Sequence, residues 1–198
     1  MGREIWRAGN MLYPLPAVMV SCARPGEKPN IITVAWAGTI CSSPAMVSIS
    51  VRPNRYSYDI LKETKEFVVN LTTEKLVRAT DYCGVKSGRD VDKFKEMKLT
   101  AIPGVHVKAP MIEESPVNME CRVREIVPLG SHHMILADVL AVHADEKYMD
   151  ERGRFHLNEA EPMIYSHGGY YGCGEQLGTC GYSVKKPEKT AEKKPRKR

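Results

Sequence analysis

Length, composition and charge place this chain among ordinary globular proteins. It has 198 residues, 42% of them hydrophobic and 27% charged, with a formal net charge of +5, which suits one domain with a sizeable core. No apolar run is long enough to span a membrane, and Met1–Asn10 lacks the apolar core of a secretory signal, so we expect a cytoplasmic protein with no membrane partner.

The net positive charge belongs to the end of the chain. Lys185–Arg198 holds eight basic and two acidic side chains, which leaves 21 basic and 22 acidic side chains in residues 1–184. Because the end segment is poor in apolar residues, it predicts a disordered basic tail after one domain that spans residues 1–184. Such tails are more often solvated than bound to nucleic acid, and we expect no nucleic-acid partner.

Three predicted strands open the chain. Ala17–Ala23 and Ile31–Ala37 are apolar runs on either side of a Pro-Gly turn, and they predict a hairpin. Gly38–Pro44 is then a predicted connection to a third strand at Met46–Val51. Because side chains alternate along a strand, the Val and Ile side chains of this third strand would face the core, and its two serines would share the opposite face with Arg52.

Two helices and a fourth strand follow. Ser57 is the predicted N-cap of a helix that ends near Lys65, and the apolar run Phe67–Leu71 predicts a strand. One threonine of the pair Thr72–Thr73 would cap a second helix that ends near Tyr82.

The remaining elements are mostly strands. Cys83–Asp90 is a predicted loop, Val91–Met97 a helical turn, and Val105–Val107 a short strand in a segment rich in Pro and Gly. Asn118–Val127 and Met134–His143 predict a second, longer hairpin. Because hairpins dominate and regular β–α alternation is absent, the sequence predicts a mainly β fold, an antiparallel Greek-key barrel with inserted helices.

Polar side chains gather where the first hairpin and the third strand end. Asn30, Thr33 and Trp36 recur every three residues, and the serine face of the third strand leads into Arg52-Pro53-Asn54-Arg55-Tyr56-Ser57 at a helix entrance. Small side chains let a flat group approach the backbone, and cations beside a helix N-terminus bind phosphate. The pattern favours a cradle for a planar, anionic ligand over an ordinary hairpin with a buried tryptophan.

Other motifs carry less information. Ser87-Gly88-Arg89-Asp90 can wrap a phosphate or be an ordinary loop, and His132-His133 can be solvated turn residues. The six cysteines and six histidines show no paired ligand spacing, so we expect no metal. Dinucleotide-binding, P-loop and nucleophile-elbow motifs are absent from the sequence.

Five segments, in order, resemble one known family. They are Asn-x-x-Thr-Val-Ala-Trp-Ala-Gly at 30–38, Ser-x-Ser-Val-Arg-Pro-x-Arg-Tyr-Ser at 48–57, Tyr-Cys-Gly-x-x-Ser-Gly-Arg-Asp-x-Asp-Lys-Phe at 82–94, Gly-Ser-His at 130–132 before Ala-Asp-Val at 137–139, and Tyr-Tyr-x-x-Gly-Glu-x-Leu-Gly at 170–178. Together they closely resemble the flavoredoxin branch of the flavin reductase-like, FMN-binding split-barrel family, over residues 11–182.

The resemblance implies a split-barrel homodimer with one FMN per subunit near the dimer interface. It also implies which residues contact FMN. These are Asn30, Thr33, Val34, Ala35 and Trp36 at the isoalloxazine ring, Ser50, Val51, Arg52 and Pro53 at its polar edge, and Arg55, Tyr56, Ser57, Ser87, Gly88 and Arg89 at the ribityl phosphate. His132 matches a family position that faces the substrate.

The flavin itself would carry the electrons, so we predict no catalytic side chain. The resemblance leaves two functions open. One is an NAD(P)H-dependent flavin or ferric reductase, and the other is an electron carrier that a redox protein reduces and that has no nicotinamide site.

Overall fold

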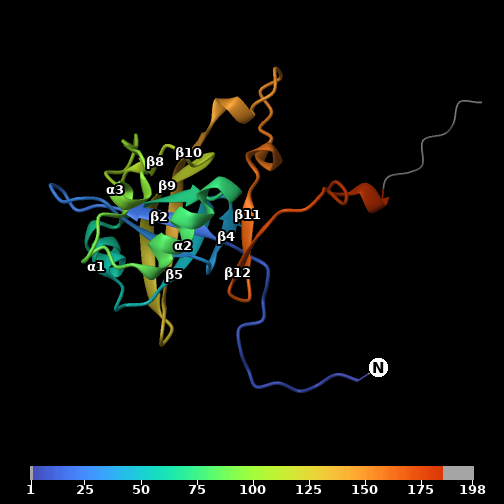
Figure 1. The fold of residues 1–198 in the computed structure, drawn as a ribbon, viewed down its shortest axis with the longest axis horizontal. Coiled ribbons are helices and arrows are strands. Elements are labelled where there is room, and N and C mark those ends of the chain that lie inside the picture. The colour runs from blue at the N-terminus through green and yellow to red at the C-terminus, as the bar shows by residue number, and fades with distance from the viewer. Residues whose placement is uncertain (1, 185–198) are drawn as a thin grey trace, which may run out of the picture.

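The computed structural model describes residues 2–184, which fold around one strongly curled β-sheet (Figure 1). The tail predicted at residues 185–198 lies outside the described residues. Extended segments before the first strand and after the last one project from the body, and they are drawn in blue and red in Figure 1.

Seven antiparallel strands form the main sheet, in the spatial order β3-β2-β6-β9-β10-β5-β4. In chain order they are β2 (Val18–Cys22), β3 (Asn30–Val34), β4 (Ala37–Ser42), β5 (Ala45–Val51), β6 (Glu66–Leu71), β9 (Val117–Pro128) and β10 (His133–Ala144). The predicted long hairpin is confirmed, because β9 and β10 pair from Pro128 and His133 at the turn to Val117 and Ala144 at the far end.

Smaller elements surround this sheet. A three-stranded sheet joins β1 (Leu15–Pro16), β11 (Met163–Ser166) and β12 (Gly169–Gly172), and a two-stranded one joins β7 (Ala101–Ile102) and β8 (Met111–Ile112). The helices are α1 (Tyr56–Thr64), α2 (Val77–Val85) and α3 (Lys93–Met97), with single 3-10 turns at η1 (Glu74–Leu76), η2 (Glu146–Tyr148), η3 (Leu157–Ala160) and η4 (Tyr182–Val184).

The main sheet curls into a barrel that is open along one side. β3 and β4 are its two edge strands, yet they follow one another in the chain with only Ala35–Trp36 between them. Two intervening residues span at most about 11 Å, so the edges must meet at this corner. No hydrogen-bonded ladder joins β3 to β4 among the described residues, and the mainly β, split-barrel prediction is therefore confirmed.

The predicted strand Ile31–Ala37 is wrong at its end, because the chain bends at Ala35–Trp36. β3 ends at Val34, and most of the predicted connection at Gly38–Pro44 belongs to β4. The Trp36 carbonyl accepts a hydrogen bond from the Ser50 backbone N–H at 2.8 Å, which holds the bend against β5. The bend is therefore maintained by a hydrogen bond from another strand, and neither Ala35 nor Trp36 is a residue type that signals a turn.

Apolar side chains fill both faces of the sheet where it is covered. Inside the barrel, Val20, Ile49, Phe67 and Ile135 pack with Leu61 of α1. On the outer face, a separate cluster joins the sheet to α2 and α3 and contains Met19, Ile31, Leu76, Ala79, Cys83, Phe94, Leu99 and Ile112. Every residue of β2 is buried because β2 has a core on each side.

The segment between α3 and β9 corrects a second prediction. Val105–Val107 is a loop, and the short strands there are β7 and β8. The backbone N–H groups of Val105, His106 and Val107 donate to the carboxylate of Glu120 at 3.0, 2.6 and 2.8 Å. A buried carboxylate therefore replaces the strand partner that these N–H groups would otherwise need.

Candidate functional site

Two adjoining cavities lie at the corner where the barrel is open. The first, of about 420 Å³, is bounded by residues 33–36, residues 50–52, Gly84 and His132, and we call it the slot. The second, of about 380 Å³, is bounded by Asn30, residues 54–57, residues 86–89 and Lys93, and we call it the cationic pocket. Ile32, Arg52 and Arg55 line both cavities, so the two adjoin one another.

The walls of the slot come from strands, α2 and the hairpin turn. The rings of Trp36 and His132 meet edge to face, with centroids 4.3 Å apart. Thr33 Oγ1 donates to the Thr80 carbonyl at 2.5 Å and ties β3 to α2. A Cβ on Gly84 would lie 3.3 Å from the Thr33 Cβ, so glycine lets α2 approach this strand closely.

The small hairpin of β11 and β12 closes another side of the slot. Tyr165 and Tyr170 from this hairpin line the cavity with Asp81 of α2. The Tyr170 hydroxyl donates to Asp81 Oδ1 at 3.3 Å. Burial, with the negative charge and hydrogen bond of Asp81, raises the pKa of Tyr170 to about 12, so the phenol stays protonated.

The cationic pocket is strongly positive. Of the described residues, five basic side chains and no carboxylate line it. The five are Arg52, Arg55, Lys86, Arg89 and Lys93. The N-terminus of α1 also begins at this pocket, with Tyr56 and Ser57 in its wall. Backbone N–H groups at a helix N-terminus and clustered cations both favour an anion.

Two of these cations are fixed by the C-terminus of α2. The last carbonyls of a helix lack partners within the helix, and here the Cys83 carbonyl accepts from Lys93 Nζ at 2.8 Å while the Gly84 carbonyl accepts from Arg55 Nη2. Cations at a helix C-terminus also complement its dipole. The helix end therefore positions two positive charges for the pocket.

Lys93 is the most deeply buried of the five. Its side chain is only 3% exposed, and Nζ also donates to the Ile31 carbonyl at 2.6 Å. Because an ammonium has three donors, one N–H remains for a ligand in the pocket. Burial, with a smaller effect of Arg55, lowers the pKa of Lys93 to about 8.

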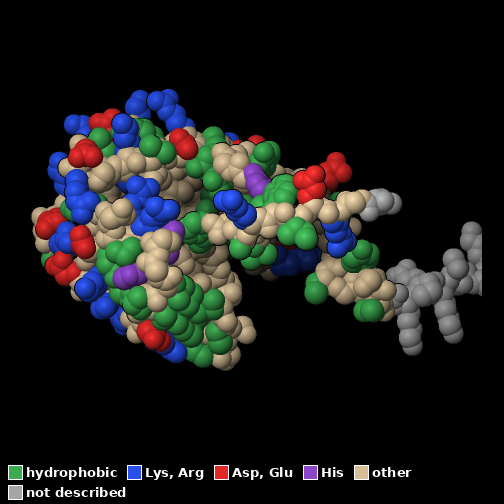
Figure 2. Space-filling view, turned by 90° about the horizontal axis from the view of Figure 1, so that it is seen from below, with side chains coloured by type: hydrophobic (Ala, Val, Ile, Leu, Met, Phe, Trp, Pro, Cys, Tyr) green, Lys and Arg blue, Asp and Glu red, His purple; other side chains and the backbone are tan. Residues whose placement is uncertain are grey.

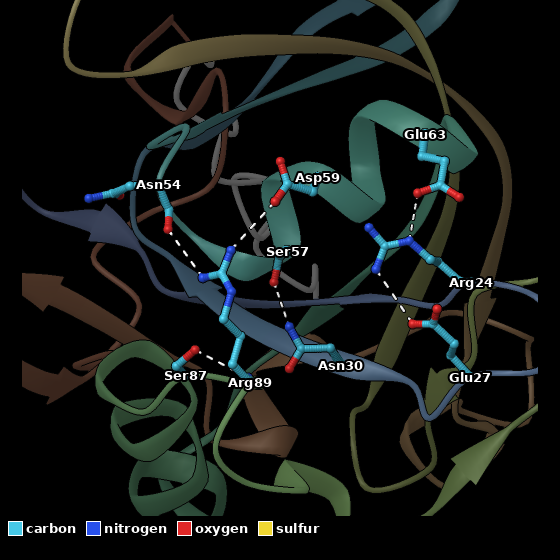
Figure 3. A network of polar contacts seen from close by, with 9 residues as sticks. All are labelled: Arg24, Glu27, Asn30, Asn54, Ser57, Asp59, Glu63, Ser87 and Arg89. Carbon is cyan, nitrogen blue, oxygen red and sulfur yellow. Dashed lines mark hydrogen bonds and ion pairs between the residues drawn. The ribbon is translucent and has the colours of Figure 1, made fainter.

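Ser57 does not cap α1, which corrects the predicted N-cap. The helix begins at Tyr56 with Arg55 in the cap position, and Ser57 lies inside the first turn. The Ser57 hydroxyl instead accepts a hydrogen bond from Asn30 Nδ2 at 2.7 Å (Figure 3). This bond joins β3 to α1 in the lining of the cationic pocket.

The predicted ligand residues lie together. All of the residues predicted to contact FMN line one of the two cavities except Pro53, and His132 lines the slot. Their contacts with a flavin stay predictions. Sequence reasoning assigned no role to Lys93, Lys86 or Tyr170, although Lys93 and Tyr170 stand inside quoted motifs.

The loop predicted at Cys83–Asp90 is also shorter than expected. α2 continues to Val85, beyond the predicted end near Tyr82, and the loop begins at Lys86. Cations that bind the final carbonyls stabilise this extra turn, and they come from distant segments that local propensity cannot reveal.

The fold and the site together are a split barrel with two adjoining cavities at its open corner, and comparisons with known proteins show the family of the chain. Residues 10–174 match the family model described as flavin reductase like domain. The flavoredoxin structure of Desulfovibrio vulgaris (Miyazaki F) is 30% identical with a TM-score of 0.86, and the match covers 93% of this chain and 100% of that one.

Two further relatives are similar. The flavoredoxin of Methanosarcina acetivorans is 26% identical with a TM-score of 0.84, over 93% of this chain and 98% of that one. An NADH:FMN oxidoreductase of Rhodococcus erythropolis is 25% identical over 84% of this chain and 79% of its own length. The chain belongs to the flavin reductase-like family, in its flavoredoxin branch, and its cofactor class is a flavin. Among the described residues, no helix is long and apolar enough to cross a membrane.

Proposed function

We propose that this chain binds FMN and passes electrons through it. One observation carries the proposal: the slot adjoins a pocket that, within residues 2–184, is lined by five cations and no carboxylate. A flat ring with a phosphate at the end of its side chain has this distribution of shape and charge. FMN has both of these features, which supports the proposal.

The residues present fit the parts of FMN. Residues 33–36 and Ser50 would face the isoalloxazine ring, and Arg52, at the junction of the cavities, would add positive charge near its polar edge. Ser57, Arg89 and Lys93 would hold the phosphate. Bound FMN supplies the hydride and single-electron chemistry, and the protein binds it, orients it and tunes its potential.

We favour an NAD(P)H-dependent flavin or ferric reductase. A third cavity of about 540 Å³ adjoins the slot, shares Trp36, Arg52 and His132 with it, and is walled by residues 9–13 of the N-terminal segment. This cavity gives a small-molecule donor or acceptor a route to the flavin. Burial and the charge of Arg52 lower the pKa of His132, so it would meet the substrate as a neutral imidazole.

The similarity to two flavoredoxins favours a second candidate, an electron carrier that a redox protein reduces. Steady-state oxidation of NADH and NADPH, with FMN or a ferric chelate as acceptor, separates the two. We expect turnover with at least one nicotinamide. A protein that holds FMN but oxidises neither nicotinamide would be the carrier.

FMN binding itself is tested by quenching of flavin fluorescence. We expect FMN to bind at least about a hundredfold more tightly than riboflavin, because charge-assisted bonds to the phosphate contribute a few kcal/mol. Equal affinity for the two flavins would contradict the assigned phosphate site.

We further propose that the protein is a homodimer. Large hydrophobic side chains are exposed on the N-terminal segment at Ile5, Trp6 and Leu12, and on the edge strand β4 at Ile40. Figure 2 shows hydrophobic side chains gathered over one part of the surface. Exposed apolar surface of this kind marks protein contacts.

A further inference from the structure

Four residues form a wall between the cationic pocket and another cavity on its far side. This cavity, of about 380 Å³, is bounded by residues 27–29 and 90–92, and we call it the outer pocket. Asn30, Tyr56, Gly88 and Arg89 line both cavities. The wall stands at the end of the cationic pocket, where the phosphate of FMN would lie.

Asn30 and Gly88 are the tightly packed residues of the wall. Asn30 is 4% exposed and donates to Ser57. A Cβ on Gly88 would lie 2.1 Å from Asn30 Oδ1 and 2.9 Å from Tyr56 Cδ1, so the loop rests directly on both side chains.

Tyr56 is held by a neighbouring ion network. The Arg24 guanidinium lies 6.0 Å from the centre of the Tyr56 ring. Arg24 Nε donates to Glu63 at 2.6 Å, and its Nη1 lies 3.5 Å from Glu27 (Figure 3). These contacts fix the arginine that packs on the ring.

Arg89 is the exposed member of the wall. Its side chain is 51% exposed and lies with the guanidinium 5.2 Å from the centre of the Tyr56 ring. Its contacts with the Asn54 carbonyl and with Asp59 are both long, at 3.5 Å (Figure 3). Because these contacts are long and exposed, the Arg89 side chain can be shortened without breaking a buried contact.

The outer pocket itself repels anions. In the part of the chain that the structure describes, its lining holds three acidic side chains, Glu27, Asp90 and Asp92, and two basic ones, Lys28 and Arg89. Lys28 Nζ already lies 3.9 Å from Asp92 Oδ2. A second phosphate that passed the wall would therefore meet a net negative surface.

We propose that Arg89 determines cofactor specificity by closing the phosphate end of the site, so that a flavin mononucleotide fits and a flavin dinucleotide is excluded. The inference rests on the proposed FMN function and adds to it. FMN ends at its phosphate, whereas FAD continues through a second phosphate to adenosine and must cross the wall. Exclusion by a barrier and by like charge is a general route to specificity.

The test compares dissociation constants for FMN, FAD and riboflavin, measured by fluorescence quenching on the full chain. The variants are Arg89→Ala and the control Arg124→Ala, because Arg124 is also half exposed and ion-paired, at 2.5 Å to Asp138, on β9. Tyr56→Leu removes the surface on which Arg89 packs and tests the wall by a second substitution. Circular dichroism checks that each variant is folded.

We expect the wild type to prefer FMN over FAD by about a hundredfold or more. Arg89→Ala should bind FAD more tightly than the wild type does, and so reduce this ratio at least about tenfold. Tyr56→Leu should reduce it in the same direction, while Arg124→Ala should retain it. Riboflavin affinity should be unchanged in Arg89→Ala, because riboflavin has no phosphate and does not reach the wall.

Two results would overturn the inference and leave the proposed function intact. One is a wild type that binds FMN and FAD equally, and the other is a folded Arg89→Ala protein whose affinity for FAD does not rise. A wild type that binds no flavin at all would overturn both the inference and the proposed function.

Discussion

Lys93 illustrates how one residue links folding to cofactor binding. Its ammonium is buried against two carbonyl groups, which it satisfies, and it lies in the wall of the cationic pocket. With a pKa lowered to about 8, it binds fewer protons in the folded state than in the unfolded state between about pH 8 and its ordinary value of 10.5. Its contribution to stability therefore rises with pH over that window.

Cofactor binding should have the opposite pH dependence. A phosphate beside Lys93 favours the charged form and raises its pKa, so the affinity for FMN should fall as the pH rises above about 8. The FMN phosphate keeps its charge over this range because its second pKa is about 6. The measurement is the dissociation constant between pH 7 and 9.5.

The Lys93→Met variant tests whether Lys93 causes this pH dependence of FMN binding. We expect it to bind FMN at least about tenfold more weakly at pH 7, since a charged hydrogen bond contributes roughly 1.5–3 kcal/mol. Its pH profile should be flat above pH 8. A wild-type profile that is equally flat would contradict the role of Lys93.

Glu120 supports the loop at residues 105–107 rather than the cofactor. Burial raises its pKa, but hydrogen bonds from the loop backbone and from His143, at 2.6 Å, outweigh burial and lower the pKa to about 2. The stability that Glu120 provides is therefore present above pH 4.5 and lost as the pH falls from 4.5 toward 2.

Glu120→Gln should lower the free energy of unfolding by roughly 2–3 kcal/mol. The NH₂ group of the glutamine would face a backbone N–H, and this N–H would lose the carboxylate oxygen that accepts its hydrogen bond in the wild type. Chemical denaturation at pH 7 measures this. Glu125→Gln, on the exposed part of β9, is the matched control and should change little. Equal stabilities for the two variants would contradict the account.

At the scale of elements, buried amides attach the segment of β7 and β8 to the main sheet. Asn70 of β6 accepts from the Ile112 N–H at 3.0 Å and from Asn118 Nδ2 at 2.8 Å. Its own amide donates to the Met19 carbonyl at 2.9 Å. One side chain therefore joins three strands and the inserted segment.

Asn70→Ala should destabilise the protein by roughly 2–4 kcal/mol, because it leaves several buried partners unsatisfied. Hydrogen exchange at the Ile112 amide should accelerate more than exchange within β9. Asn158→Ala, at an exposed position in η3, is the control. Uniform acceleration across all strands would argue against a local attachment.

Strands that are marked by an apolar run between turn residues could be predicted from the sequence. Features that are stabilised by a residue from another part of the chain could not. β2, β5, β6 and the long hairpin follow directly from apolar runs and turn residues. The bend at Ala35–Trp36 depends on the Ser50 N–H, so a continuous β-branched and apolar run concealed it.

Some site residues could likewise be predicted from the local sequence, and others could not. The residues at 30–36 and 50–57 could be found because small polar side chains interrupt apolar strands. Lys93 could not, because a buried lysine in a short helix has the same sequence appearance as an exposed one. Only the fold brings it to the carbonyls of Ile31 and Cys83.

At the scale of the whole molecule, the proposed dimer explains apolar surface that a monomer would expose. Sedimentation equilibrium should give twice the mass of the chain. Ile40→Asp, on β4, should weaken association at least about tenfold, because it places a charge in an apolar contact. Val105→Asp, at an exposed loop position, is the control, and a monomeric wild type would contradict the proposal.

The central claim, that the adjoining cavities hold FMN, is tested most directly by the visible absorption spectrum of the protein as purified, followed by heat release and identification of the chromophore. We predict flavin bands and about one FMN per chain, which is the stoichiometry expected for one site in each subunit. A colourless protein that also fails to quench the fluorescence of added FMN would contradict the account.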